Sequence, residues 1–358
     1  MRRFKGLAIG LALLILVLAG FLFLRSPKPI IELKAETVIS IGPFNVTNTY
    51  ITSWFVIIFI SLFAYAATRR MSLVPRGIQN LFEAIIEAIY NLIVRTAGEK
   101  HGRRFFPVVA TIFLYVAISN WFGLLPFFAT VGKVEEISAH ESAFHEKGVV
   151  IQQKAGLNVI MPAADDVELP KTVTLPDGKV EEVNADSPVE VKQLAIDEAK
   201  KEAGLSEDAK IGILIPFLRS VNTDINGPLA LAVWSAIFVE FWGISTYGFF
   251  RYGSKFFNFG RLLRGKIVDG VVDAFVGILE LVAEAARLIS FTFRLFGNIL
   301  AGEILFLVVI FLLPLVGLQV VYFMELFVGA IQAFIFGMLT LVFGIMAVSA
   351  PHGEAEGH

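Results

Sequence analysis

The chain has 358 residues, of which 56% are hydrophobic and only 17% are charged, and its formal net charge is −2. Because charged residues make up about a quarter of an ordinary soluble domain, this composition indicates an integral membrane protein. The sequence contains no cysteine, which excludes disulfides, thiolate metal sites and cysteine nucleophiles.

Apolar runs predict where the chain crosses the membrane, because a helix needs about 20 apolar residues to span a bilayer. Runs of this kind cover residues 7–24, 51–68, 105–131, 227–250, 267–302 and 304–350. The run 267–302 also carries several ionisable residues. The last run is too long for one span, and Pro314 with Gly317 predicts a turn near its first third.

The first apolar run has two interpretations. A basic start, Met1–Lys5, followed by the apolar residues 7–24 is typical of a signal peptide as well as of a membrane helix. The run is long, and no clear small-x-small cleavage site follows it. We therefore favour a retained membrane helix, with a cleaved signal peptide as the alternative.

The run from Pro75 to Ala97 has a different pattern, with apolar residues at helical spacing along one side and Glu83, Glu87 and Asn91 on the other. Basic residues follow it, so we expect an amphipathic helix on the membrane surface. Lysine and arginine gather in the loops on one predicted side of the membrane. This side is predicted to be cytoplasmic and to hold both chain termini.

Charge is distributed unevenly along the chain. Between Lys133 and Lys210 there are 17 acidic and 9 basic residues, whereas the rest of the chain has 15 acidic and 21 basic residues. An acidic extracytoplasmic insert is therefore expected in a membrane protein with basic loops. Within it, residues 175–180 are typical of a turn between two short strands, and residues 189–204 favour a helix that a glycine ends.

These patterns predict an all-α integral membrane protein with about five to six membrane helices. Two of the helices are expected to be long and tilted and to form a hairpin, beside one surface amphipathic helix and a small extracytoplasmic α+β insert. The expected parts are an N-terminal helix with an extracytoplasmic segment (residues 1–50) and a first group of membrane helices (51–131). The insert (132–216), a second group of membrane helices (217–350) and a tail (351–358) follow.

An arginine interrupts the apolar sequence FTFRLFGN, at position 294. An arginine at mid-membrane costs roughly 2.5–3.5 kcal/mol. It stays protonated at physiological pH, so it cannot lower this cost by losing its proton. Arg294 must therefore face protein, water or a carboxylate. A structural ion pair or a side chain that reaches the membrane surface is the alternative to a functional role.

Other polar residues share a helix face with Arg294. Glu280, Glu284, Arg287, Arg294 and Asn298 are spaced by 4, 3, 7 and 4 residues, which places them in one stripe of a helix. Lipid does not accommodate such a stripe, so it is expected to line an aqueous path or to face a partner.

Two further carboxylates and an amide lie in the apolar runs. Glu303 follows Arg294 by nine residues, about half a turn round the helix, and Glu325 and Gln332 are seven apart on the final helix. Gln332 is placed to reach Arg294 from an antiparallel neighbour. Carboxylates in apolar surroundings bind protons more readily than in water, so these are candidates for a proton relay. A satisfied ion pair is the alternative for each carboxylate.

Four motifs carry a family resemblance. RLFGNILAGE (294–303) resembles the signature of the F-type ATP synthase subunit a family, and QAFIFGMLT (332–340) resembles its last-helix motif. NWFGLLP (120–126) is similar to the end of its third common helix, and TDIN (223–226) followed by LALA is similar to the start of its fourth. The N-terminal helix and the insert lie outside this resemblance.

The resemblance implies a stator subunit that holds two offset proton half-channels against a rotating ring of c subunits. Arg294 matches the family's essential arginine, which displaces the proton from each ring carboxylate. Glu325 stands where some members have histidine, so the protonation behaviour of the histidine form is not assumed. Positions of the family pattern for proton translocation are also matched by Asn120, Asp224, Glu280, Ser290, Asn298, Glu303 and Gln332.

The implied partners are the c-subunit ring, the b-subunit peripheral stalk and the remainder of the ATP synthase, in a bacterial plasma (inner) membrane. The subunit is expected to be non-catalytic and to need no cofactor or metal. No glycine-rich lysine motif for phosphate is present, so no nucleotide is expected to bind, and no basic surface for nucleic acid is present. The proton is the expected ion, with Na⁺ as the alternative.

Three other classes are weighed against this one. A secondary ion-coupled transporter is the main alternative, but the internal repeat common in such folds is not evident. An intramembrane hydrolase is disfavoured because the sequence from His140 to His145 lacks the spacing of a His-Glu-x-x-His zinc site. A haem protein is disfavoured because no histidine falls within a predicted span.

Overall fold

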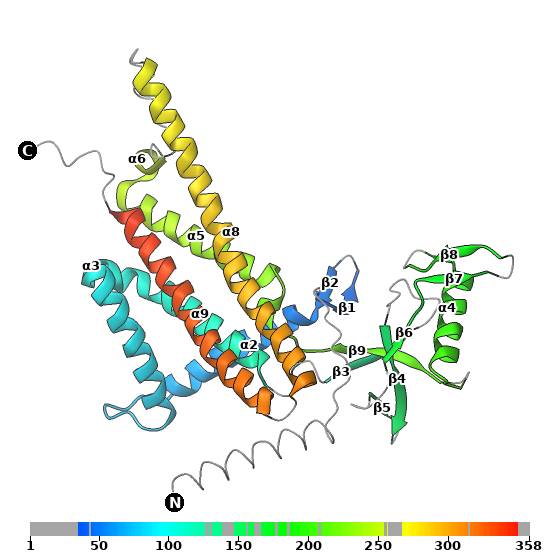
Figure 1. Ribbon diagram of the computed structural model, residues 1–358. Coiled ribbons are helices and arrows are strands. Elements are labelled where there is room, and N and C mark those ends of the chain that lie inside the picture. Colours follow the sequence, from blue (N-terminus) through cyan, green and yellow to red (C-terminus); the bar gives the residue numbers. More distant parts are fainter. Residues whose placement is uncertain are drawn as a thin grey trace, which may run out of the picture. The chain divides into compact units, whose positions relative to one another are not determined.

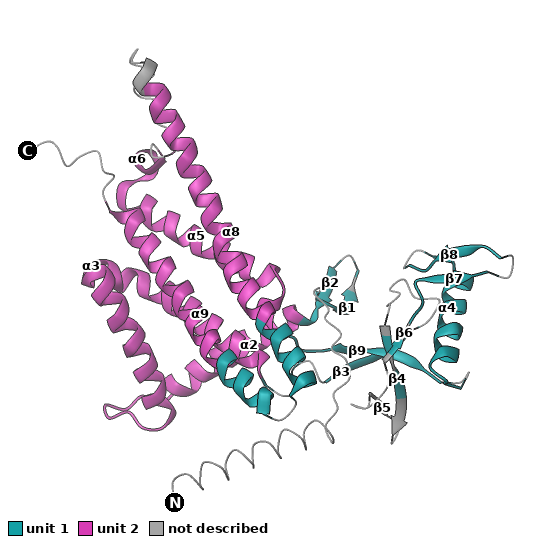
Figure 2. Ribbon diagram, in the orientation of Figure 1, with its two compact units in different colours: residues 1–48, 125–219, 302–325 teal, residues 49–124, 220–301, 326–358 magenta. Residues whose placement is uncertain are grey.

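The computed structural model describes residues 35–42, 44–125, 128, 131–137, 147–154, 157–160, 166–175, 178–184, 187–206, 209–253, 256, 267–313 and 316–349. The predicted helix 7–24, its signal-peptide alternative and the tail 351–358 lie outside the described residues. The chain divides into two compact units, which Figure 2 colours separately. Unit 1 comprises residues 1–48, 125–219 and 302–325, and unit 2 comprises residues 49–124, 220–301 and 326–358.

Five helices are long and apolar enough to cross a membrane (Figure 1). They are α2 (Asn48–Thr68), α3 (Ile78–Gly123), α5 (Asn226–Tyr247), α8 (Ile267–Leu312) and α9 (Val316–Val348). The predicted all-α membrane fold is confirmed. Of the turn predicted at Pro314 and Gly317, Pro314 lies outside the described residues; α8 ends at Leu312, and Gly317 is the second residue of α9.

Helix α3 differs from the prediction at both ends of its membrane-spanning part. The expected surface helix and the following span are joined in one element, kinked at Gly98, whose φ of 73° and ψ of 165° are accessible only to glycine. The helix ends at Gly123 rather than at Val131. Pro126 accounts for this earlier end, because a proline disfavours helical geometry at the residue before it.

Helix α5 also ends earlier than predicted. It stops at Tyr247 rather than Phe250, because Gly248 takes a φ of 83° and turns the chain into the short helix α6 (Phe249–Gly253). The start of α5 follows a short 3-10 turn, η1 (Val221–Thr223).

The interior of unit 2 is built from apolar side chains of α3, α5, α8 and α9. Phe105 of α3 is fully buried and packs against Trp242 of α5, with 4.2 Å between the ring centroids and the rings tilted by 35°. Phe291 of α8 packs on Phe336 of α9 at 4.9 Å. Outward-facing side chains of α2 and α8 are also apolar. Because such large apolar surfaces are unstable in water, they are consistent with contact with lipid.

The insert of unit 1 is a small α+β region. One sheet has the order β3-β9-β4-β5, with β6 pairing with β4. Its strands are β3 (Gly132–Glu136), β4 (Lys147–Lys154), β5 (Leu157–Ile160), β6 (Asp166–Glu168) and β9 (Ile211–Pro216). Buried side chains of the sheet, such as Ile211 and Val167, pack in one cluster with Ile196 of helix α4 (Val189–Glu202).

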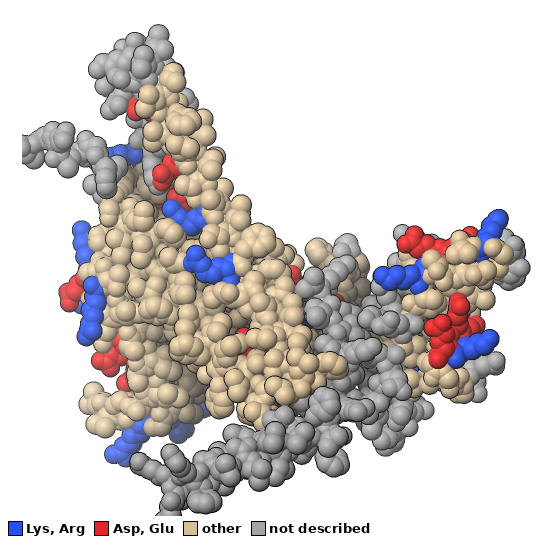
Figure 3. All heavy atoms as spheres, viewed as in Figure 1, with Lys and Arg blue, Asp and Glu red and all other residues tan. Residues whose placement is uncertain are grey.

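The remaining strands form two hairpins. Strands β7 (Thr172–Thr174) and β8 (Val180–Glu182) pair antiparallel, as predicted for the turn at residues 175–180. Strands β1 (Thr37–Ile41) and β2 (Phe44–Thr47) pair before α2. On the face drawn in Figure 3, acidic and basic side chains gather on the insert, whereas most of the helical surface is uncharged.

Candidate ion-translocating site

Arg294 lies beside the packing face of α8. Phe291, Leu295 and Ile299 recur at intervals of four and are buried against neighbouring helices. Arg294 precedes Leu295 by one residue, a rotation of about 100° round the helix, and its side chain is half-buried. The arginine is therefore held at the edge of a rigid interface rather than inside it.

The residues one helical turn on either side of Arg294 have exposed side chains. Ser290 and Asn298, one turn before and one turn after the arginine, are both exposed. Phe293, on the same side of α8, is 55% exposed. The predicted polar positions Ser290, Arg294 and Asn298 thus form a continuous strip that the described part of unit 2 leaves at least partly open.

Arg294 forms no ion pair or hydrogen bond with any residue that the structure describes. Gln332, which the sequence places to reach it from α9, is 7% exposed and shares no hydrogen bond with it within the described chain. The arginine's charge is therefore not neutralised by the described part of the molecule.

Glu303 has a partner that the sequence analysis missed. The Nη2 atom of Arg219 lies 3.2 Å from Oε2 of Glu303, and the side chains are 8% and 28% exposed. Arg219 follows β9 in a loop before η1, where a lone basic residue resembles an ordinary membrane flank. No spacing rule connects the two residues in the sequence, and only the folded chain shows the pair.

Glu325 packs against the backbone of α8. Its side chain is 8% exposed, and its carboxylate oxygens lie where a side-chain carbon on Gly302 would stand. Gly302 immediately precedes Glu303. Glu325 of α9 therefore lies against the residue next to Glu303 of α8. The absence of a side chain at Gly302 leaves room for the Glu325 carboxylate.

Asn120 lies in a buried hydrogen-bond network. Its Nδ2 donates to the carbonyl of Gly329 on α9 at 3.2 Å, and its Oδ1 accepts from Nδ2 of Asn222 in η1 at 2.7 Å. Asn222 is fully buried and was not singled out from the sequence. These bonds fix the end of α3 to α9 and to the start of α5.

Asp224 sits where η1 leads into α5. Its Oδ1 accepts from the backbone N–H of Asn226 at 3.2 Å, and its Oδ2 accepts from the hydroxyl of Thr49 at 3.1 Å. An aspartate in this position satisfies an orphan amide of the helix start. These contacts join α2 to α5.

The first part of α8 carries the other predicted carboxylate. Glu280 is half-buried, one turn before Glu284. Glu284 pairs with Arg287 at 2.8 Å, and the Arg287 guanidinium lies 3.8 Å from the ring centroid of Phe343. Within the described ranges, no group of three or more histidines and carboxylates is arranged to hold a metal ion.

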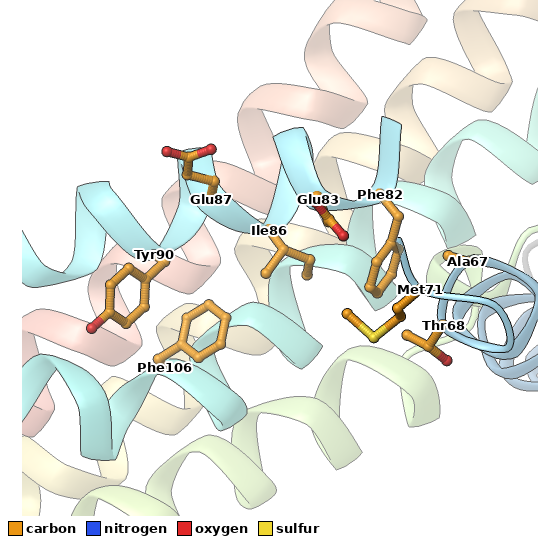
Figure 4. Close-up of a pocket in the computed structure, with 9 residues that line it drawn as sticks. All are labelled: Ala67, Thr68, Met71, Phe82, Glu83, Ile86, Glu87, Tyr90 and Phe106. Atoms are coloured by element: carbon orange, nitrogen blue, oxygen red, sulfur yellow. The ribbon is translucent and has the colours of Figure 1, made fainter. Parts of the chain in front are cut away.

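A cavity of about 440 Å³ lies where the end of α2 meets α3. Its lining is mostly apolar and includes Phe82, Ile86 and Phe106 (Figure 4). None of the predicted ion-path residues lines it. The cavity is therefore separate from the strip around Arg294.

The ATP synthase A chain family matches residues 50–140 and 209–344. The two matched segments cover more than half of the chain and contain every predicted ion-path residue. The chain belongs to the ATP synthase A chain family. This membership places it among membrane proteins of ATP synthesis and proton transport.

Curated relatives agree with this family. The chain is 25% identical over 315 residues to ATP synthase subunit a of Helicobacter acinonychis strain Sheeba, covering 87% of this chain and 95% of the relative. It is 26% identical to ATP synthase subunit a of Helicobacter pylori strain Shi470, with the same coverage. The ATP synthase A chain family match leaves out residues 141–208, which make up most of the insert.

Proposed function

We propose that this chain is the stator subunit that passes protons through two half-channels to a rotating ring of c subunits, without being itself catalytic. The observation that carries this proposal is Arg294, a half-buried arginine in an apolar helix that has no carboxylate partner among the described residues. Membership of the ATP synthase A chain family supports the same function.

The physical argument concerns the missing counter-charge. An arginine at mid-membrane costs roughly 2.5–3.5 kcal/mol. The attraction of an opposite charge about 4 Å away stabilises the arginine by about 4 kcal/mol at an effective dielectric constant of about 20. A carboxylate from another subunit would therefore offset the cost. If each ring subunit carries one carboxylate, Arg294 attracts every carboxylate in turn and favours release of its proton.

The permanent charge also separates two proton paths. Along α8, Glu303 follows Arg294 and is joined by Arg219, whereas Glu280 precedes Arg294. We assign the carboxylates after Arg294, with Glu325, to one half-channel and those before it to the other. A proton that crosses directly would have to pass a fixed cation, which repels it.

The proposal extends to partners and location. The exposed strip at Arg294 would face the c ring, and the b-subunit stalk and the remaining subunits complete the assembly. The chain would lie in a bacterial plasma (inner) membrane, with its termini cytoplasmic and residues 132–216 outside. Basic residues such as Arg69, in the turn after α2, and Arg103, within α3, favour this orientation.

The test is ATP-driven acidification of inverted vesicles that contain the assembled complex. Arg294→Ala should abolish acidification while subunit assembly and soluble ATPase activity are kept. Arg76→Ala, which removes an exposed arginine before α3, is the matched control and should pump normally. Normal coupled pumping by Arg294→Ala would refute the stator function of Arg294.

A further inference from the structure

A second group of ionisable residues lies in unit 2, at the opposite end of α5 from Asp224. It comprises Glu240 of α5, Tyr252 of α6, and Glu284 and Arg287 of α8. Three helices supply these side chains. Glu240 and Tyr252 belong to no motif that the sequence analysis used.

Tyr252 fixes the geometry of this group. Its side chain is 6% exposed, and its ring rests directly on the backbone of Gly243, where a side-chain carbon would overlap the ring. Burial, followed by the negative charge of Glu240, raises the pKa of Tyr252 far above its ordinary value. Its phenol therefore stays protonated, and Glu240 is the charged residue that affects it most.

Two of the charges in the group are paired with each other. Arg287 is engaged by Glu284 at 2.8 Å and by the ring of Phe343. Glu240 is not part of that ion pair. Its side chain is partly buried, and its Oε1 atom is inaccessible to solvent and forms no hydrogen bond with the described residues. A shielded carboxylate oxygen without a hydrogen bond is uncommon in proteins, and it marks Glu240 as a candidate for a role beyond structure.

The position of Glu240 along α5 agrees with a role in transport. It lies seven residues, or about 10 Å, before the end of α5, and Glu284 lies ten residues, or about 15 Å, before Arg294 on α8. Along the two helices, the group therefore lies between the end of α5 and the level of Arg294.

We infer that Glu240 is a proton-relay residue of the half-channel that opens at the end of α5. The inference rests on the proposed function, because it assigns a new residue to one of the two proposed paths. The proton binds to the Glu240 carboxylate and passes through water to the polar stripe of α8. No bond to carbon is made or broken.

Two substitutions separate proton transfer from structure. Glutamine has nearly the shape of glutamate but cannot carry a proton in this way, whereas aspartate is shorter but keeps the carboxylate. The measurement is passive proton flux through the membrane sector in vesicles from which the soluble ATPase part has been removed, with assembly checked by recovery of the c ring. Glu87→Gln, at an exposed carboxylate of α3, is the control.

We expect Glu240→Gln to lose most of the flux and Glu240→Asp to retain more of it than the glutamine variant. The reverse order, or equal flux in both variants, overturns the inference and makes Glu240 a structural partner of Tyr252. If Glu240→Gln does not assemble, the flux of Glu240→Asp as a function of pH decides. A profile shifted from that of the wild type supports the relay, and an unchanged profile refutes it.

Arg294→Ala, measured for ATP-driven pumping in vesicles that keep the soluble ATPase part, keeps the two proposals distinct. Loss of ATP-driven pumping in Arg294→Ala, together with normal flux in Glu240→Gln, would refute only the relay at Glu240. Normal pumping in Arg294→Ala would refute the stator proposal itself.

Discussion

A single methyl group on Gly302 should displace the Glu325 carboxylate. In Gly302→Ala the new carbon would occupy the space of both carboxylate oxygens. The obstructing group is the end of a flexible side chain, so we expect Glu325 to rotate away rather than α8 and α9 to separate. The variant should therefore assemble normally while the carboxylate moves.

The size of the effect follows from this displacement. The carboxylate must move by about 1 Å or more to restore ordinary contact distances. Holding a side chain off its preferred rotamer costs about 0.5–1.5 kcal/mol. If proton transfer requires the original position, a cost near the upper half of this range lowers the flux roughly five- to tenfold.

Passive proton flux in vesicles measures this loss. Gly253→Ala is the control, because a side-chain carbon on Gly253 meets no atom within 4 Å. The double variant Gly302→Ala with Glu325→Asp should regain part of the flux, since aspartate withdraws the carboxylate by one methylene group. Full flux in assembled Gly302→Ala, or no gain in the double variant, would show that the contact does not position Glu325.

Two further predictions concern buried polar contacts. Arg219→Ala should reduce proton flux roughly fivefold or more, because the part-buried Glu303 loses its partner at a cost of about 1–3 kcal/mol. Arg219→Lys should keep part of the flux, since it keeps the charge. Equal flux in the wild type and Arg219→Ala would contradict this prediction. Asn120→Ala should destabilise the membrane sector by about 1–3 kcal/mol, because the buried Asn222 amide loses its hydrogen-bond acceptor. Thermal unfolding of the purified complex measures the effect. An unchanged unfolding midpoint would argue against a stabilising role of the network.

The helices and the arginine strip were predictable because they depend on local pattern. Apolar runs of sufficient length predicted α2, α5, α8 and α9, and periodic spacing placed Glu280, Glu284, Arg287, Arg294 and Asn298 on one helix, as α8 has them. Such spacing is fixed by helix geometry alone and does not require knowledge of the neighbours.

Contacts between distant segments were not predictable. Arg219 and Glu303 are 84 residues apart, and Asn120 and Asn222 are 102 apart, so nothing in their local sequence indicates the pairing. In the sequence, Glu240 is a single charge in the apolar run 227–250, with nothing to indicate a partner. Its relation to Tyr252 depends on the turn at Gly248, which brings α6 back toward α5.

The pairing of β3 with β9 makes the insert a replaceable module. Gly132 stands opposite Pro216 in an antiparallel ladder, so the chain leaves the helical core and returns to it through two neighbouring strands. Adjacent strands lie only about 5 Å apart, a gap that a tight turn can close. The sequence between β3 and β9 can therefore be lengthened, shortened or exchanged while Gly132 and Pro216 stay paired. The distance between the points where the insert begins and ends is then unchanged.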